Sequence, residues 1–296
     1  MIAGKPCYTT IPIDAWAIST DGEKPFSSSF NARSTMSQTT TNFIALGSRL
    51  LGVPEVITLG VKPNFPDYTV RERDLIIRSE RILFPTLNYA QFLTTMGKRI
   101  FPSLETYLYA DEKIKQTTLF YMLGIPHPRT RIYYPLHHNE ILNDFSFPFI
   151  AKLARRSSGG RGIFLLRNSE DLETYLRATR VAYIQEYLRH ERDLRVVLIN
   201  YQPVVAYWRV RGSGEFRTNL SQGGKISFED IPAEGIRLAQ ESAVKCRFND
   251  VGMDLIHARG TWYVIEANMK YGREGLKMKG LDLKNILRSK LLSGEI

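Results

Sequence analysis

Cysteine is nearly absent from this chain, and the two residues present cannot build a disulfide framework. They are Cys7 and Cys246, and neither belongs to a Cys-x-x-Cys pair. The five histidines show no spacing typical of a metal site: His127, His137, His138, His190 and His257. These absences exclude a disulfide-rich scaffold and a zinc-finger module, and they favour a reducing compartment.

Long hydrophobic runs are also missing. No stretch reaches the roughly 18 uncharged apolar residues that a membrane span requires. Near the N-terminus, Lys5, Pro6 and Asp14 interrupt the apolar residues, so no signal-peptide core is evident. The sequence predicts a cytoplasmic protein that has no membrane partner.

Acidic residues are outnumbered by basic ones. The 296 residues include 30 Asp and Glu against 40 Lys and Arg, which gives a formal net charge of +10. This balance favours anionic partners such as phosphates, carboxylates or nucleic acid. Because the basic residues are spread along the whole chain and no RNA-binding signature or paired zinc ligands occur, we expect no nucleic-acid partner. With 43% hydrophobic residues the chain is globular, and its length suggests two or three lobes.

The N-terminal third reads as alternating strands and helices. Apolar residues at 43, 46, 50 and 53 have helical spacing, whereas residues 55–61 and 74–78 read as short strands. A Ser/Thr-rich stretch over residues 27–42 is typical of a surface loop, or of a loop that faces a nucleotide. The pattern predicts a small α/β domain.

Two further segments follow a boundary near residue 108. Asp111 can cap a helix that runs to Leu123, where Gly124 and two prolines end it. Strands and one helix at 169–178 then predict a lobe built on antiparallel strands. After it come strands around a turn at 200–203, a helix from Pro232 towards Cys246 and a hairpin over 251–267. We therefore expect domains at 1–108, 109–190 and 191–296.

The last hairpin carries the strongest local signal. Glu266 and Asn268 share a strand face, and a turn at Arg259 and Gly260 brings Asp254 opposite Glu266 or one residue away. Facing carboxylates are destabilising unless something neutralises them. A divalent cation that binds oxygen ligands, Mg²⁺ or alternatively Mn²⁺, would neutralise them. The alternative is a solvated acidic edge, which the apolar neighbours disfavour.

A second signal joins a lysine to a glycine-rich turn. Lys152 ends the apolar run FPFIAK, and Ser157, Gly159, Gly160 and Gly162 lie in the turn that follows. Glycines let backbone N–H groups approach phosphate oxygens, and the ammonium adds charge. A hairpin loop without a ligand remains the alternative, because the pattern matches no nucleotide-binding fingerprint.

A third signal is a set of polar strand positions. Arg209 shares a face with Arg211, and Arg217 shares one with Asn219. Such residues could line a phosphate-binding groove, or they could be solvated surface arginines.

Together these blocks resemble the ATP-grasp carboxylate-amine ligases, particularly the RimK-like glutamate ligases. The resemblance runs from about Leu75 to Leu287. It is carried by FPFIAKLARRSSGGRGIFLL, YIQEYLRHERDLRVVLI, GEFRTNLSQGG and GMDLI with VIEAN and GREG. It implies an ATP-grasp fold, in which two α+β lobes grip ATP behind a small α/β pre-ATP-grasp domain.

The resemblance also implies roles for individual residues. It assigns Lys113 and Lys152 to the ATP phosphates, with Ser157, Gly159, Gly160 and Gly162 in the phosphate loop. The adenine hinge would be Gln185, Glu186, Tyr187 and Leu188, and the remaining nucleotide-side residues would be Asp193, Arg195 and Asn219. Catalytic charges would come from Lys152, Arg209 and Arg217, and the magnesium ligands would be Asp254, Glu266 and Asn268.

The sequence departs from the family after Asn268. Met269, Lys270 and Tyr271 replace the family's small residue, Ser and Pro, and Arg273 is inserted before Glu274. That loop faces the acceptor in relatives, so Lys270 and Arg273 are candidate contacts to an anionic small-molecule or peptide substrate.

The implied function is an ATP- and magnesium-dependent ligase that joins a carboxylate to an amine, for example by adding glutamate to an acceptor. The alternatives are another ATP-dependent transferase on the same scaffold and a non-catalytic nucleotide-binding regulator. Because all three metal positions are filled, the ligase is favoured over the regulator. The family resemblance also makes a homo-oligomer an open expectation.

Overall fold

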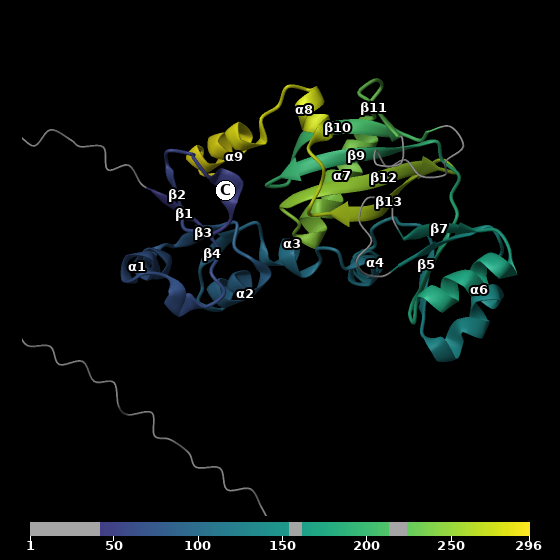
Figure 1. Cartoon of the computed structure of the whole chain (residues 1–296). Helices are drawn as coiled ribbons and strands as arrows, with labels where there is room; N and C mark the ends of the chain where they lie inside the picture. Colours follow the sequence, from purple (N-terminus) through teal and green to yellow (C-terminus); the bar gives the residue numbers. More distant parts are fainter. Residues whose placement is uncertain (1–41, 154–161, 213–223) are drawn as a thin grey trace, which may run out of the picture. The chain divides into compact units, whose positions relative to one another are not determined.

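The computed structural model describes residues 42–153, 162–212 and 224–296, which belong to one compact unit (Figure 1). These residues form three separate sheets, of four, four and five strands. Among them no helix is long and apolar enough to cross a lipid bilayer.

The first sheet is parallel and lies in the N-terminal part. Its order is β2-β1-β3-β4, with β1 at Phe43–Ala45, β2 at Val56–Thr58, β3 at Arg81–Leu83 and β4 at Arg99–Phe101. Helices α1 (Val70–Arg78), α2 (Leu87–Thr95) and α3 (Leu104–Leu108) accompany it, as do the 3₁₀ turns η1 (Ser48–Leu50) and η2 (Phe65–Asp67). The predicted α/β alternation is confirmed.

Two element assignments in this part were wrong. Residues 43–45 are a strand, because Ile44, Ala45 and Leu46 form a continuous buried run of the kind that parallel strands need. Residues 74–78 are the end of α1, because a capping box between Thr69 and Glu72 starts a helix there.

The second sheet is antiparallel, as predicted, with the order β5-β8-β6-β7. Its strands are β5 (Thr130–Tyr133), β6 (Phe149–Lys152), β7 (Ile163–Leu166) and β8 (Ala182–Glu186). Helix α6 (Ser169–Ala178) packs on it, after η3 (Pro135–Glu140) and α5 (Ile141–Asp144). Helix α4 (Lys113–Met122) precedes this sheet. Asp111 does not cap α4, because it has a positive φ of 60° and its side chain pairs with Lys270.

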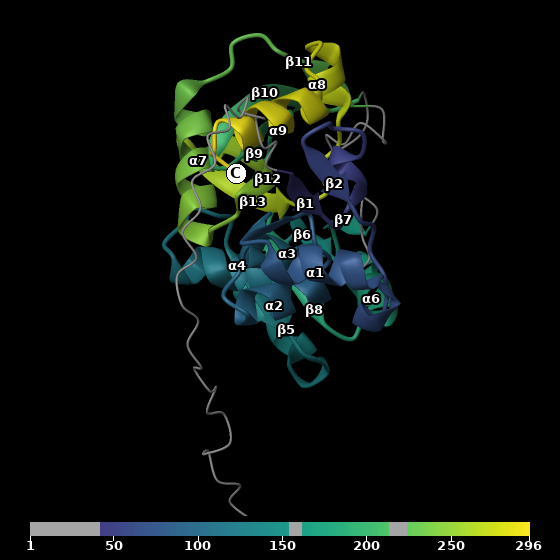
Figure 2. The ribbon, with the colours of Figure 1, turned by 90° about the vertical axis from the view of Figure 1, so that its left-hand side faces the viewer.

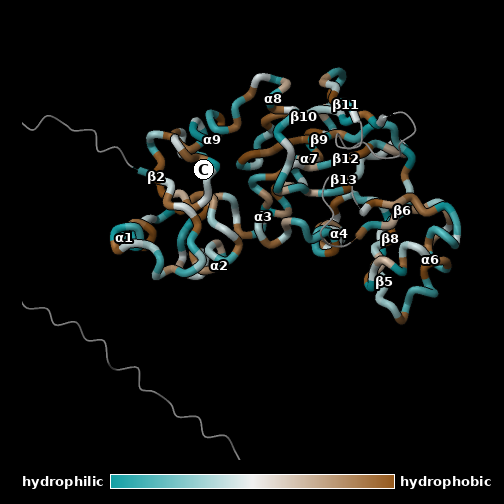
Figure 3. Tube along the Cα trace, viewed as in Figure 1, coloured by the Kyte–Doolittle hydropathy of each residue, from teal (hydrophilic) through white to brown (hydrophobic). Residues whose placement is uncertain are grey.

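The third sheet has the order β11-β10-β9-β12-β13 and is antiparallel throughout. Its strands are β9 (Arg192–Ile199), β10 (Gln202–Val210), β11 (Lys225–Ser227), β12 (Asp250–Ala258) and β13 (Thr261–Asn268). Helix α7 (Ala233–Cys246) covers one face of this sheet (Figure 2) and packs there against apolar side chains of β9 and β12. Figure 3 shows the hydropathy of these segments along the trace. The predicted turn, helix and hairpin of this segment are confirmed.

The chain ends in α8 (Glu274–Met278) and α9 (Leu283–Leu292). Leu276, Leu283 and Leu287 share one buried cluster with Leu50 of η1 and with Val197 of β9. The C-terminal helices therefore pack against the N-terminal sheet as well as the third sheet. Each sheet falls inside one of the three expected segments, whereas the boundaries at 108 and 190 stay predictions.

Candidate functional site

One face of the third sheet carries a row of polar side chains across four strands. In register, Tyr207 of β10 lies opposite Arg195 of β9, Arg195 lies opposite Asp254 of β12, and Asp254 lies opposite Glu266 of β13. Next to this row, Arg209 lies opposite Asp193. The prediction that Asp254 faces Glu266 is confirmed, and the face opposite to α7 becomes the candidate site.

Four charged groups at the centre of the row are nearly fully buried and alternate in sign. Arg195 holds Asp254 through two hydrogen bonds, one of them 2.7 Å from Nη2 to Oδ2. Arg209 donates from Nε to Asp193 at 2.6 Å, and its Nη2 lies 2.9 Å from the same Oδ2 of Asp254. Since Asp193 and Asp254 are 1% and 2% exposed, their charges are compensated almost entirely by the two guanidinium groups.

The pKa values follow this arrangement. Burial alone would raise the pKa of Asp254, but Arg195 and Arg209 outweigh it and hold the pKa below its ordinary value. Burial likewise opposes the charge of Arg209, and Asp193 and Asp254 outweigh it and raise the pKa of that guanidinium. Both groups are therefore ionised at neutral pH.

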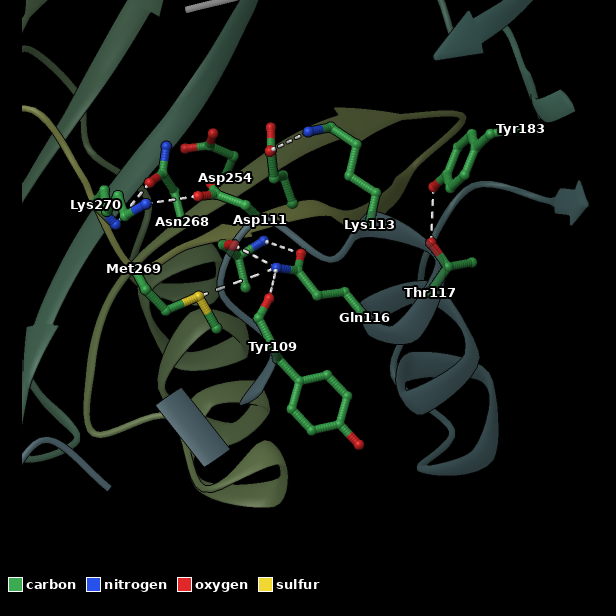
Figure 4. Close-up of polar contacts among 12 residues, drawn as sticks. Tyr109, Asp111, Lys113, Gln116, Thr117, Tyr183, Asp254, Asn268, Met269 and Lys270 are labelled. Carbon is green, nitrogen blue, oxygen red and sulfur yellow. Dashed lines mark hydrogen bonds and ion pairs between the residues drawn. The ribbon is translucent and has the colours of Figure 1, made fainter. Parts of the chain in front are cut away.

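Lys113 compensates the other facing carboxylate, with its Nζ 3.3 Å from Oε1 of Glu266. Gln116, one turn later on α4, holds this helix against β13: its amide donates to the carbonyl of Ala267 at 2.8 Å and accepts from the Ala267 N–H at 3.1 Å (Figure 4). Sequence reasoning missed Gln116, although its i+3 position places it beside Lys113 on the helix. Gln116 thus positions Lys113.

Neutralisation of the facing carboxylates therefore comes from the chain itself. The sequence reasoning gave that task to a divalent cation, whereas Arg195, Arg209 and Lys113 perform it in the structure. Among the described residues, no three His, Cys, Asp or Glu side chains gather as a metal-binding group.

The predicted magnesium ligands nevertheless have suitable chemistry. Asp254 and Glu266 face each other, and Asn268 follows two residues later on the same strand face, so hard oxygen donors lie together (Figure 4). Asp254 accepts three hydrogen bonds or ion-pair contacts from the arginines, which leaves about one of its roughly four acceptor positions. The donor set fits Mg²⁺ without removal of the arginines.

Lys152 ends β6 and is 6% exposed. Its ammonium lies 5.4 Å from the centre of the Tyr183 ring, whose hydroxyl hydrogen-bonds Thr117 on α4 at 2.7 Å. Burial lowers the pKa of Lys152 to about 8, and the negative charges of Glu266 and Asp254 act in the opposite direction. Tyr183 thus links this ammonium to α4, the helix that carries Lys113.

The predicted adenine hinge, residues 185–188, begins in the last two residues of β8 and continues towards β9 of the third sheet. Gln185 donates to Thr130 at 2.8 Å, and Glu186 accepts from the Arg129 N–H at 2.8 Å and pairs with Arg259 at 3.1 Å. Leu188 is buried beside Ile256 and Ala258 of β12, and Tyr187 lies between these anchored residues. The segment is therefore held on both sides.

Several predicted residues lie outside the described part of the chain: the loop 27–41, Ser157, Gly159, Gly160, Arg217 and Asn219. Gly162 is described, with a φ of 85° and its carbonyl accepting from Leu153 at 2.8 Å. Arg211 is described too, and it pairs with Glu191 at 3.5 Å near the surface.

The two candidate substrate contacts separate in the structure. Lys270 pairs with Asp111 at 2.7 Å, and its backbone N–H bonds Oδ1 of Asn268 at 2.9 Å. Arg273 instead lines a pocket of about 370 Å³.

Comparison with known proteins gives a consistent result. The family model described as a RimK-like ATP-grasp domain matches residues 110–290. A probable alpha-L-glutamate ligase of Alkalilimnicola ehrlichii is 28% identical over 180 residues, which are 58% of this chain and 60% of that protein. A ribosomal protein bS6–L-glutamate ligase of Escherichia coli is 29% identical over 183 residues, which are 59% and 61% of the two chains. The chain thus matches about three fifths of the length of these relatives.

Among solved structures, a RimK domain protein of Sphaerobacter thermophilus aligns with a TM-score of 0.61 at 14% identity. The alignment covers 84% of this chain and 98% of that one. This likeness shows the ATP-grasp fold, as the sequence predicted.

Proposed function

Because the chain belongs to the RimK-like ATP-grasp family, we propose that it is an ATP- and Mg²⁺-dependent ligase that joins a carboxylate to an amine. The added group would be an amino acid such as glutamate, and the acceptor a peptide, protein or small molecule. The names of the two relatives support glutamate as the added amino acid. Enzymes of the ATP-grasp family use ATP.

The observation that carries this proposal is the convergence of three buried cations on the oxygen-rich end of the hairpin. Lys113, Lys152 and Arg209 are 8%, 6% and 7% exposed; Lys113 pairs with Glu266, Arg209 pairs with Asp254, and the Lys152 ammonium lies over the Tyr183 ring. Lys113 and Arg209 are balanced by these carboxylates, whereas no hydrogen-bond acceptor among the described residues holds the buried ammonium of Lys152, which favours an added anion. A nucleotide triphosphate has the charge to act as this anion.

The chemistry needs little covalent participation by the protein. An oxygen of the substrate carboxylate attacks the γ-phosphorus, the bond to the β-phosphate oxygen breaks, and ADP leaves. The amine then attacks the acyl phosphate, inorganic phosphate leaves, and the amine loses a proton. Alignment and charge stabilisation dominate such phosphoryl transfers.

Residues of this chain would supply that stabilisation. Lys113, Lys152 and Arg209 would contact phosphate oxygens, and the segment 185–188 would hold adenine. Asp254, Glu266 and Asn268 would hold Mg²⁺, which supplies charge neutralisation at the phosphates when bound.

The direct test measures ADP and phosphate release from ATP and Mg²⁺ with a panel of carboxylates, each with and without amines. Mass spectrometry of the products identifies the bond formed. We expect ADP release that depends on both substrates, together with a product heavier by one amino-acid residue. ADP release without a new C–N bond would point to another transferase, and the absence of turnover despite ATP binding would point to a regulator.

Glu266→Gln tests the metal assignment. The change removes a proposed ligand charge, so turnover with Mg²⁺ should fall about 100-fold or more, on the scale of losing several kcal/mol of charge stabilisation. Stability should change by less than about 1 kcal/mol, because the loss of the Lys113 pair is offset by relief of the charge facing Asp254. Steady-state kinetics measures the change in turnover, and urea unfolding measures the change in stability. Wild-type turnover in this variant would exclude Glu266 as a ligand.

A further inference from the structure

A cation-rich pocket lies between the C-terminal helices and the turn η1. Its wall includes Arg49, Arg273, Lys277 and Lys284, with Asp282 as the acidic side chain among the lining residues. The volume of about 370 Å³ is at the lower end of the range for small-molecule sites, ~300–1,000 Å³. Even with Arg49 paired to the buried Asp250, the lining keeps an excess of positive charge that suits an anionic group.

Arg49 is held in place at the base of this wall. Its Nη1 donates to Oδ2 of the buried Asp250 at 2.6 Å, and its guanidinium carbon lies over the rings of Phe84 and Tyr271, 5.5 and 5.7 Å from their centres. Tyr271 donates its hydroxyl to Oδ1 of Asp250 at 2.6 Å. The Arg49 side chain therefore has little conformational entropy left to lose when a ligand binds.

The Arg49 guanidinium also has N–H donors that its partners in the protein do not use. This guanidinium carries five N–H groups, and the described residues that engage it through hydrogen bonds are Asp250 and the hydroxyl of Tyr271, so N–H groups remain for a ligand. Its side chain is 27% exposed. A fork of this kind matches the two oxygens of a carboxylate or phosphate.

The other walls of the pocket are fixed by packing. Lys284 donates its ammonium to the Leu51 carbonyl at 2.8 Å and so ties α9 to the end of η1. Gly275 packs against the Tyr207 ring so closely that a Cβ would lie 2.2 Å from a ring carbon, which seats α8 on β10. Lys277 on α8 and Arg273 at its N-cap therefore lie on either side of this anchored glycine.

The basic residues after Asn268 lie on different surfaces of the protein. Lys270 pairs with Asp111, and Lys279 lies 4.4 Å from the centre of the Phe228 ring. Arg273 and Lys277 line the pocket together with Arg49 and Lys284, which come from distant parts of the sequence. The pocket is thus assembled by the fold.

The pocket is separated from the proposed reaction centre along β12. Asp250, which holds Arg49, precedes Asp254 by four residues on the same strand face. At ~3.4 Å per residue this is roughly 14 Å. One free amino acid is too short to occupy both places, whereas an extended peptide of about four residues can.

We infer that this pocket binds a carboxylate of an extended acidic peptide, remote from the group that reacts. The inference rests on the proposed ligase function for the identity of the peptide as acceptor. That the pocket suits a carboxylate is argued independently of this function, from its cationic residues Arg49, Arg273, Lys277 and Lys284.

The test uses the exposed pair Arg273→Glu/Lys277→Glu, which leaves the Arg49–Asp250 pair intact. A tetraglutamate peptide is titrated into the full chain with Mg²⁺ and a non-hydrolysable ATP analogue. The control, Arg237→Glu/Lys245→Glu on α7, makes the same change in net charge at exposed positions outside the pocket. We expect the dissociation constant to rise at least tenfold in the pocket variant and less than threefold in the control.

Three results would overturn the inference: equal weakening in both variants, no weakening in either, or binding of free glutamate or inorganic phosphate as tight as that of the peptide. The affinity for the ATP analogue should stay within twofold in both variants, which checks that the fold is intact. Because no turnover is needed, a failure of the proposed ligase activity leaves this binding result unaffected. If the pocket variant keeps both normal ligase turnover and unchanged peptide affinity, the assignment of the pocket is wrong while the proposed ligase function stands.

Discussion

Lys152→Met is expected to weaken ATP binding about 10- to 100-fold and at the same time to make the protein harder to unfold. The first effect follows from the loss of a charge-assisted contact to phosphate, which contributes about 1.5–3 kcal/mol. The second follows from burial: the ammonium is 6% exposed, and among the described residues no hydrogen-bond acceptor holds it. A methionine of similar length fills the space without a desolvation cost.

The pKa of Lys152 gives the size and the pH range of the stability gain. Burial lowers this pKa from 10.5 to about 8, which corresponds to roughly 3 kcal/mol at neutral pH. Between pH 8 and 10.5 the unfolded chain holds more protons at this residue than the folded protein, so wild-type stability rises with pH. The advantage of Lys152→Met should therefore be full below pH 8 and decline towards pH 10.5.

Urea unfolding of both proteins at pH 7 and pH 9.5, together with nucleotide titration, checks this prediction. Lys115→Met is the matched control, because Lys115 lies on the exposed side of α4 two residues after Lys113; it should change neither property. A Lys152→Met protein that is less stable than wild type at pH 7 would show that the buried ammonium stabilises the fold.

Sequence reasoning succeeded where the signal is local. The hairpin of β12 and β13 was predictable because alternation and the turn at Arg259 and Gly260 fix its register as far as Leu255 and Val264. A register shift between Leu255 and Asp254 then sets Asp254 opposite Glu266, and the sequence left this pairing open by one residue. The helix predicted at 169–178 is confirmed, and the structure adds its N-cap, Asn168, whose side chain accepts from the Asp171 N–H.

The sequence could not show what neutralises those carboxylates. Arg195 reaches Asp254 from β9 and Arg209 reaches it from β10, on the far side of β9, and the strand order is not encoded in any local pattern. Arg49 is about 200 residues from Asp250 in the chain, and Lys113 reaches Glu266 from α4. Such pairs depend on tertiary packing and could be found only in the folded structure.

The contrast between Arg209 and Arg211 leads to the second large effect. The sequence places both on one strand face, yet Arg209 is 7% exposed and bonds Asp193 and Asp254, whereas Arg211 pairs with Glu191 at 3.5 Å near the surface. Arg209→Met should lower the free energy of unfolding by about 3–5 kcal/mol, because buried carboxylates lose their partner. Arg211→Met should cost less than about 1 kcal/mol.

A double-mutant cycle identifies the cause. Asp193→Asn removes the charge that Arg209 compensates, so the loss caused by Arg209→Met should shrink by at least about 1 kcal/mol in the Asp193→Asn background. Urea unfolding of the four proteins without nucleotide measures this coupling independently of catalysis. If Arg209→Met and Arg211→Met cost the same, or if Asp193→Asn leaves the Arg209 effect unchanged, the buried charges are not coupled. Coupling of the expected size would mean that Arg209 stabilises the fold in the absence of ATP. The activities of the wild type and of Arg209→Met must therefore be compared at the same fraction of folded protein.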